Sequence, residues 1–396
     1  MTVSTAVKWA VSSMTGAPTL NGTAGSLIAL LDAFLVHGFG TKAVDSAQVT
    51  SGVCRMAITG ASAAVDHCVI QLAGVTGSGA VLNGLQRVKT AAASYVEFAC
   101  DLPDGPLTGT ITFKIAPLGW EKVFSKTNVA VYRSTDSAGT RAYYRVDDTN
   151  ALYARVQMYE SMTDVDTGVA VAPLPSVLNG GYYWHKRSAA SANGVYWVLV
   201  GDSRAFVLLV ASNAGSAPST SGGYGLVPNC AGDLRSYRSG DAWSAVLTGA
   251  PTATYSDIAG CVFSAGGSTG ITLQRLSAGI GGAVQAARSV WGAPGGVSGA
   301  DATLGAYPSR ADNGLRLSSI ALSDGAMATY GPRGELAGMY HSPQTGVLAS
   351  FGADARITQG GGALVGRHLL SVGCGSLAAA ATGCGFIDIT GPWRSV

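Results

Sequence analysis

The sequence predicts a mainly β, multidomain protein made of small antiparallel barrel or sandwich domains, with one N-terminal amphipathic helix. Short runs that alternate apolar and polar residues, separated by Gly, Asn and Asp, recur through most of the 396 residues, a pattern typical of antiparallel strands. Only 12% of residues are charged, against roughly 25% in an average globular protein. The 7 Trp and 15 Tyr can fill a sizeable core, so the low charge predicts a chain that covers part of its surface with other subunits.

Residues 1–45 are predicted to form an extended arm, anchored by Trp9, and then the helix. The helix is expected over Thr23–His37, with Asn21 or Thr23 as its cap and Gly38 at its end. One face collects apolar side chains at a spacing of three or four residues, namely Leu27, Ile28, Leu31, Phe34 and Leu35.

Three β-domains are predicted to follow. Residues 46–118 hold five alternating runs at short spacing, which favours a small barrel or sandwich. Residues 119–314 are predicted to form a central sandwich-like domain, in which Val195–Val200 and Ala205–Val210 flank Gly-Asp-Ser-Arg as a hairpin. Residues 315–396, with apolar runs separated by single glycines, are predicted to form a C-terminal β-domain.

Charge and cysteine content narrow the class of protein. The net charge is +2 and no Lys/Arg run is longer than two residues, so we expect no nucleic-acid partner. The longest apolar segment, Leu27–Val36, is too short to span a bilayer, and the first residues do not resemble a signal peptide. We therefore expect no membrane insertion and synthesis in the cytoplasm. The seven cysteines include no CxxC pair, which predicts reduced core residues rather than a zinc site.

The segment Arg145–Gly168 concentrates five carboxylates that allow three interpretations. They could form the acid pair of a glycosidase, a calcium loop at Asp164 and Asp166, or the charged edge of a hairpin. The hairpin is favoured, because arginines alternate with the acids and Asp-Asp-Thr-Asn is a turn sequence. We expect the acids to pair with Arg141, Arg145 or Arg155, or to bond to turn backbone. The sequence assigns no catalytic, cofactor-binding or metal-binding residue, and it leaves a cation at Asp164 and Asp166 open.

A second candidate is the aromatic segment Tyr182-Tyr183-Trp184-His-Lys-Arg. These rings could form a binding surface for sugars or protein. The alternative, which we favour, is that they fill a sandwich core or a subunit interface.

Several segments together resemble a structural protein of tailed bacteriophages. They are SSMTGAPTLNGTAGSLIALLDAFLVHGFG, VLNG, APLGWEKVFSKTNVAVYRS, YYRVDDTNALYARVQMYESMTDVDTG, WVLVGDSRAF and FIDITGPWR. The resemblance covers most of the chain except roughly residues 212–310. It implies a virion component of the tail tip or baseplate, made in the host cytoplasm, with other tail or baseplate proteins as partners. Cyclic symmetry around a tail axis leads us to expect a homo-oligomer, a trimer or a sixfold ring.

The expected function is therefore structural and not enzymatic. Three alternative functions stay open: a receptor- or glycan-binding tail-tip protein that contacts the host cell surface, a capsid-associated vertex or decoration protein, and a glycan depolymerase. The residues expected at subunit interfaces are Trp9, Leu27, Leu31, Phe34, Leu35, Tyr182, Tyr183, Trp184 and Trp393.

Overall fold

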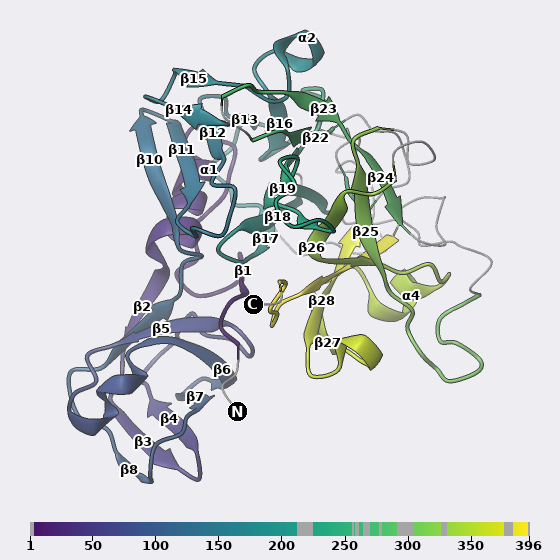
Figure 1. Cartoon of the computed structure of the whole chain (residues 1–396). Helices are drawn as coiled ribbons and strands as arrows, with labels where there is room; N and C mark the ends of the chain where they lie inside the picture. The colour runs from purple at the N-terminus through teal and green to yellow at the C-terminus, as the bar shows by residue number, and fades with distance from the viewer. Residues whose placement is uncertain are drawn as a thin grey trace.

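The computed structural model describes residues 4–211, 225–255, 257, 261–263, 270–276, 279–290, 305–325, 331–375 and 383–394. It is mainly β, with 45% of residues in strands and 9% in helices, and its strands form several antiparallel sheets (Figure 1). This confirms the predicted mainly β, antiparallel class. The division into four domains at the predicted boundaries stays a prediction.

Eight strands between Phe39 and Ile115 form the lobe at the lower left of Figure 1. They are β2 (Phe39–Ala43), β3 (Ser46–Thr50), β4 (Val53–Ala57), β5 (Val69–Ala73), β6 (Gly84–Ala92), β7 (Tyr95–Ala99), β8 (Gly105–Pro106) and β9 (Thr112–Ile115). Their order is β2-β9-β5-β6-β7-β4-β3-β8, so the edge strands do not pair with each other. No described sheet closes into a barrel, so the barrel is wrong as one of the two predicted alternatives, barrel or sandwich. Here the ladder ends at β8, because Pro106 has no backbone N–H to donate.

Two further sheets build the upper part of the molecule in Figure 1. The five-stranded one contains β10 (Trp120–Lys126), β11 (Val129–Ser134), β12 (Tyr143–Asp147), β13 (Tyr153–Tyr159) and β16 (Tyr182–His185). The seven-stranded one runs in the order β1 (Lys8–Val11), β17 (Tyr196–Gly201), β18 (Ala205–Ala211), β19 (Val227–Asp233), β21 (Ala245–Thr248), β22 (Ile271–Gln274) and β23 (Ala283–Gln285). The predicted hairpin is confirmed, because β17 and β18 pair antiparallel. A small ribbon joins β14 (Ser161–Met162) to β15 (Gly168–Val169).

The last sheet has the order β24-β25-β26-β29-β28-β27. Its strands are β24 (Ala287–Val290), β25 (Ser318–Ser323), β26 (Gly334–His341), β27 (Arg356–Gln359), β28 (His368–Cys374) and β29 (Gly383–Asp388), and β20 (Arg235–Ser236) pairs with β26. A single cluster of buried apolar side chains extends through all four large sheets, from Phe98 through Tyr144 and Trp197 to Ile387. None of the seven cysteines forms a disulfide bond, and six of them are buried.

The prediction of one N-terminal helix over Thr23–His37 is wrong. The helical residues are α1 (Ser26–Leu31) and the π-helical η1 (Asp32–His37), which come after strand β1. Gly25 has a φ of 80°, a conformation that no helix can continue, and the Asn21 side chain accepts a hydrogen bond from Thr23 N instead of capping the helix. Further short helices are η2 (Gly77–Leu82), α2 (Pro175–Leu178), α4 (Val347–Phe351) and η3 (Gly362–Leu364). In the described part of the chain, no helix has the length and apolar character needed to cross a bilayer.

The guanidinium of Arg87 on β6 joins the small lobe to both ends of the described chain. It donates to the carbonyls of Ser4 and Val7, which precede β1, at 2.9 and 2.8 Å. It also donates to His67 of its own lobe at 2.7 Å, and to Ile389 and Thr390 after β29 at 2.8 and 3.1 Å. Burial lowers the pKa of Arg87 to about 10, so the side chain still carries its charge at neutral pH.

Substitution of Arg87 by Met should lower the free energy of unfolding by about 3 kcal/mol or more, because five carbonyls lose a charged donor. The measurement is urea denaturation followed by fluorescence. The matched control is Arg55→Met in the same lobe, whose side chain is 57% exposed and 3.4 Å from Glu97, and it should cost less than about 1 kcal/mol. Equal losses in the two variants would contradict the assigned role.

Candidate functional site

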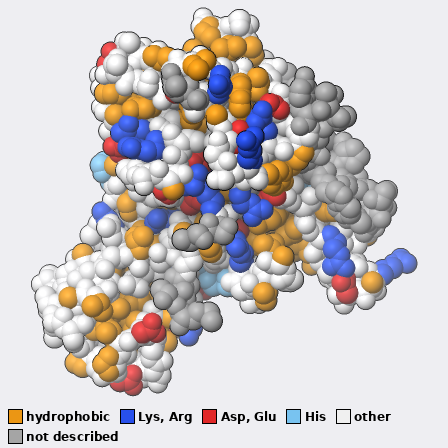
Figure 2. Space-filling model, viewed as in Figure 1, with side chains coloured by type: hydrophobic (Ala, Val, Ile, Leu, Met, Phe, Trp, Pro, Cys, Tyr) orange, Lys and Arg blue, Asp and Glu red, His pale blue; other side chains and the backbone are white. Residues whose placement is uncertain are grey.

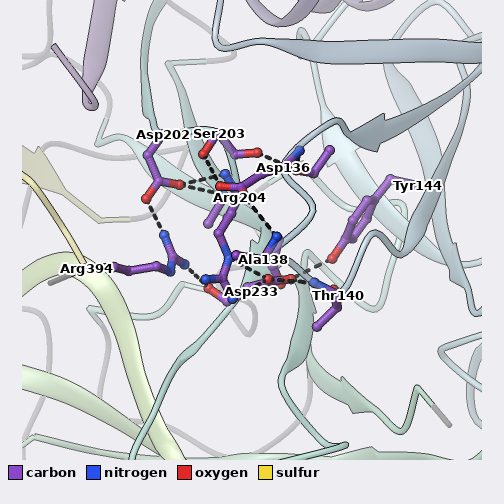
Figure 3. Close-up of polar contacts among 12 residues, drawn as sticks. Asp136, Ala138, Thr140, Tyr144, Asp202, Ser203, Arg204, Asp233 and Arg394 are labelled. Carbon is purple, nitrogen blue, oxygen red and sulfur yellow. Dashed lines mark hydrogen bonds and ion pairs between the residues drawn. The ribbon is translucent and has the colours of Figure 1, made fainter. Parts of the chain in front are cut away.

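A polar junction forms where distant parts of the chain meet beside the β17–β18 turn (Figure 3). We use "polar junction" for Asp136, Thr140, Asp202, Ser203, Arg204, Asp233 and Arg394. The β11–β12 connection contributes Asp136 and Thr140, the hairpin turn contributes Asp202, Ser203 and Arg204, β19 contributes Asp233, and the segment after β29 contributes Arg394. The figure shows their polar atoms pointing toward one another.

Asp202 organises the hairpin turn and holds the C-terminal segment. Its Oδ1 accepts hydrogen bonds from the backbone N–H of Arg204 and of Ala205, both at 2.8 Å. Its Oδ2 forms an ion pair with Arg394, which also donates to the carbonyl of Asp233. Lys8 is buried nearby, and burial lowers the pKa of its amine to about 8 although Asp202 opposes the shift. The turn thus fixes the edge strand β1 and the C-terminal segment together.

Asp233 binds the opposite side of the same turn. One of its oxygens accepts from the Thr140 backbone N–H at 2.9 Å and from Arg204 Nε at 3.0 Å, and the other accepts from the Thr140 hydroxyl. The side chain of Asp233 is only 4% exposed. Since three donors surround it, Asp233 serves as an acceptor that orders the β11–β12 connection.

Like Thr140 and Asp233, Ser203 and Asp136 form a hydroxyl–carboxylate pair that resembles a nucleophile beside a base. Ser203 Oγ donates to Asp136 Oδ2 at 2.7 Å, and Ala138 N donates to the other oxygen at 2.9 Å. The hydrogen bond from Ser203 lowers the pKa of Asp136. A carboxylate with a lowered pKa is a weak general base, so the geometry suits a structural hydrogen bond better than activation of the serine.

An open polar hollow of about 670 Å³ lies beside the polar junction. Four arginines line it, Arg204, Arg235, Arg238 and Arg394, together with Asp241. Three of these arginines are engaged by carboxylates: Arg204 by Asp233, Arg235 by Glu335, and Arg394 by Asp202. The hollow can therefore offer hydrogen-bond donors to an anionic group, but most of its positive charge is already compensated.

Four of the six segments on which the expected phage resemblance rests contribute residues to this junction or contact it. WVLVGDSRAF supplies Asp202, Ser203 and Arg204, and FIDITGPWR supplies Arg394. Trp120 of APLGWEK donates its indole N–H to the carbonyl of Asp202 at 3.3 Å. Tyr144 of YYRVDDTN donates to the carbonyl of Gly232 at 3.2 Å. Sequence reasoning missed the junction, because its charged partners lie up to 192 residues apart.

The carboxylate cluster of Arg145–Gly168 does not converge on one point. Asp147 and Asp166 contact Arg145 at 3.5 and 2.8 Å. Asp164 accepts from the backbone N–H of Asp166 and Thr167, and Glu160 accepts from Gly279 N. The expectation of arginine pairs and turn bonds is confirmed for these contacts. It is wrong for Asp148, which pairs with Lys186 and with N–H groups of α1. Arg141 contacts Glu121 instead of the cluster, and Arg155 donates to the carbonyls of Asn179 and Gly181.

Asp148 has a role that the sequence did not reveal. Its Oδ2 accepts from the backbone N–H of Leu27 at 2.8 Å and of Ile28 at 3.2 Å, so it caps α1 from 121 residues away. Its Oδ1 forms an ion pair with Lys186, and both side chains are at most 1% exposed. Burial raises the pKa of Asp148, while Lys186 and the helix N–H groups act in the opposite direction. Among the described residues, no group of three or more His, Cys, Asp or Glu could hold a metal ion.

Eight of the nine residues expected at subunit interfaces are buried within this chain. Their side chains are at most 5% exposed: Trp9, Leu27, Leu31, Phe34, Leu35, Tyr182, Trp184 and Trp393. Tyr183 is half-buried beneath Arg155, whose guanidinium lies 3.9 Å from the ring centroid. The segment around Tyr182–Trp184 therefore packs inward in the isolated chain, and its role in binding a partner stays a prediction.

No protein-family model matches the chain, and a search of curated proteins returns no match.

Substitution of Lys186 by Met should lower the free energy of unfolding by about 3 to 5 kcal/mol, because it leaves the buried carboxylate of Asp148 without its cation. Chemical denaturation measures the loss. The matched control is Lys126→Met, which removes an exposed partner of Asp166 in the same cluster and should leave stability nearly unchanged. A small effect of Lys186→Met would show that the pair is not buried as described.

Acid should destabilise the protein through the buried His185 and the half-buried His67 and His368. Burial lowers the pKa of His185 from 6.5 to about 4, and it also lowers the pKa values of His67 and His368. Between these values the unfolded state binds more protons than the folded state, so stability is lost as the pH falls from about 6.5 to about 4. For His185 alone the loss is about 3 kcal/mol.

The variant His185→Phe isolates this contribution. The difference in unfolding free energy between His185→Phe and wild type should shift in favour of the variant by about 3 kcal/mol from pH 7 to pH 4. Urea denaturation at a series of pH values measures it. A difference that does not change with pH would show that His185 titrates normally in the folded chain.

Proposed function

We propose that this chain is a structural component of a tailed-phage virion, in the tail tip or baseplate, where it assembles with copies of itself and with other tail proteins. The resemblance of its segments to such proteins suggests the class. The main observation in support of a role in assembly is a group of exposed apolar side chains at one end of the molecule. We use "apolar tip" for Val169, Leu174, Val177 and Ile280, which are 49%, 38%, 49% and 68% exposed.

These four side chains lie at one end of the molecule. Val169, Leu174 and Val177 come from β15, α2 and the segment between them. Ile280 joins them because its neighbour Gly281 contacts Ala170, and Gly279 N donates to Glu160 beside β14. Figure 2 shows hydrophobic side chains gathered at the top of the molecule, where Figure 1 places α2. Soluble monomers seldom expose several large aliphatic side chains together, and such patches usually mark a contact with another protein.

The low charge of the surface supports the same proposal. In Figure 2 the lobe at the lower left shows few charged side chains. Most of its visible surface is backbone, uncharged polar side chains (white) or hydrophobic side chains (orange). A surface of this kind suits a subunit that is covered by neighbours, because charged residues are depleted at the centre of interfaces. Stability then depends partly on assembly, since partners that bind the folded state stabilise it.

We propose that the chain is not an enzyme. The carboxylates of Arg145–Gly168 are engaged by arginines, lysines and backbone N–H groups, and Asp148 is sealed beneath α1. A depolymerase would need two carboxyl groups facing each other across an accessible groove. The alternative is a capsid-associated position, and labelling of purified particles distinguishes it from a position in the tail.

The test is mass spectrometry of purified particles with gold-labelled antibodies against the chain. We expect the chain at a fixed copy number per particle and the label at the tail end. Label on the shell would favour the capsid-associated alternative, and absence from the particle would contradict the structural role.

Substitution of Val177 and Ile280 by Asp should reduce incorporation of the chain into particles by about tenfold or more, because two charges would be buried in the contact. Quantitative mass spectrometry of particles made with the variant chain measures this. The matched control is Val365→Asp, which is 77% exposed but lies outside the apolar tip, and it should be incorporated normally. Circular dichroism should show that both variants fold, and normal incorporation of the double variant would remove the apolar tip from the assembly contact.

A further inference from the structure

A second hollow, of about 750 Å³, lies against the C-terminal sheet. We use "aromatic hollow" for it. Its lining includes residues of β25, β26, β27, β28 and η3 and of the segment 307–317. Three rings and three guanidinium groups line it, those of Tyr307, Tyr340, Phe351, Arg235, Arg316 and Arg367. Its volume falls in the range of small-ligand sites, and none of these residues belongs to the polar junction or the apolar tip.

One wall of the aromatic hollow is a fixed set of rings. Tyr307 and Phe351 lie 5.4 Å apart between centroids, and Phe351 packs edge-on against the buried Phe386 at 5.2 Å. Tyr307, Tyr340 and Phe351 are half-buried, so each keeps some accessible surface. Rings that are held by packing on one side offer a rigid apolar surface to a ligand on the other side, with little loss of side-chain entropy.

Three arginines also line the aromatic hollow, each anchored by one carboxylate. Arg235 contacts Glu335 at 2.7 Å, Arg316 contacts Asp312 at 2.6 Å, and Arg367 contacts Asp388 at 2.5 Å. The arginine side chains are still 51%, 48% and 28% exposed. A guanidinium has five N–H donors in a planar fork. Each anchored arginine therefore keeps donors that can bind a carboxylate.

Tyr340 lines the same hollow, and no described residue hydrogen-bonds to its hydroxyl. Burial raises the pKa of this hydroxyl, the carboxylates of Asp388 and Glu335 act in the same direction, and Arg367 and Arg235 oppose the shift. Thr358 and Gln359 add further polar side chains at the edge strand β27. The hollow thus combines apolar ring surface, excess arginine donors, one carboxylate acceptor and neutral hydroxyl or amide groups.

We propose that the aromatic hollow binds a saccharide that bears a carboxylate. The apolar faces of sugar rings would lie on Tyr307 and Phe351, the carboxylate on the free N–H groups of Arg316 and Arg235, and ring hydroxyls on Glu335 and Tyr340. Sugar hydroxyls both donate and accept, so they match a wall that mixes arginines with a glutamate. A phosphate-rich or strongly acidic peptide ligand would gain less, because Glu335 repels it. The proposal does not depend on the virion role.

The test uses the purified full chain and a panel of immobilised oligosaccharides containing glucuronate, galacturonate or sialate. The same saccharides with their carboxyl groups reduced to alcohols serve as matched ligands. We expect binding to at least one acidic member and about tenfold or more weaker binding to its reduced form. Hexaglutamate and AMP represent acidic peptides and nucleotides, and preferential binding of either would overturn the assignment. Absence of binding to every saccharide would also overturn it.

Substitutions of the lining arginines test whether the saccharide binds in the aromatic hollow. The double variant Arg316→Gln and Arg235→Gln changes only exposed side chains, so we expect it to fold and to bind the acidic saccharide about tenfold or more weakly. The matched control is Arg310→Gln, which is exposed on the same segment as Arg316 but does not line the hollow, and it should bind like wild type. Unchanged affinity in the double variant would show that the ligand lies elsewhere.

Discussion

The structure depends on one buried guanidinium, that of Arg87, which satisfies five main-chain carbonyls at once. Buried carbonyl groups need donors, and these five belong to the N-terminal segment, the small lobe and the segment after β29. The planar fork of an arginine can reach all of them, whereas a lysine has three donors on a single nitrogen. The orientation of the small lobe relative to the other sheets is set at this point.

Two buried ion pairs likewise join parts of the chain that are distant in sequence. Asp148 and Lys186 connect α1 to the five-stranded sheet, and Asp202 and Arg394 connect the β17–β18 turn to the C-terminal segment. Desolvation offsets much of the attraction in buried ion pairs, so they add little net stability. They do disfavour any packing that would bury one of these charges without its partner, because an uncompensated buried charge is costly. A chain with only 12% charged residues thus uses several of its charges to determine which surfaces meet.

The sequence predicted what is encoded locally. The alternating runs and the β17–β18 hairpin are found in the structure, as are the turn bonds of Asp164, because each depends on residues that are near in the chain. The helix start was misplaced, since Gly25 breaks the helix and the cap, Asp148, lies 121 residues away. The polar junction and the Arg87 contacts were missed for the same reason. An aromatic pattern such as Tyr182–Trp184 also cannot distinguish a core within the chain from one between subunits.

The separation of these partners along the chain has a consequence for the order of folding. The eight-stranded lobe uses only residues between Phe39 and Ile115, so it can form early during synthesis as a local unit. Strand β1 is made first but has to wait for β17, its partner in the sheet. The contact from Arg87 to Ile389 closes 302 residues, which a ribosome adds in roughly 15 to 60 seconds. The contacts from Arg87 to Ile389 and Thr390 can therefore form only after the rest of the small lobe has been made.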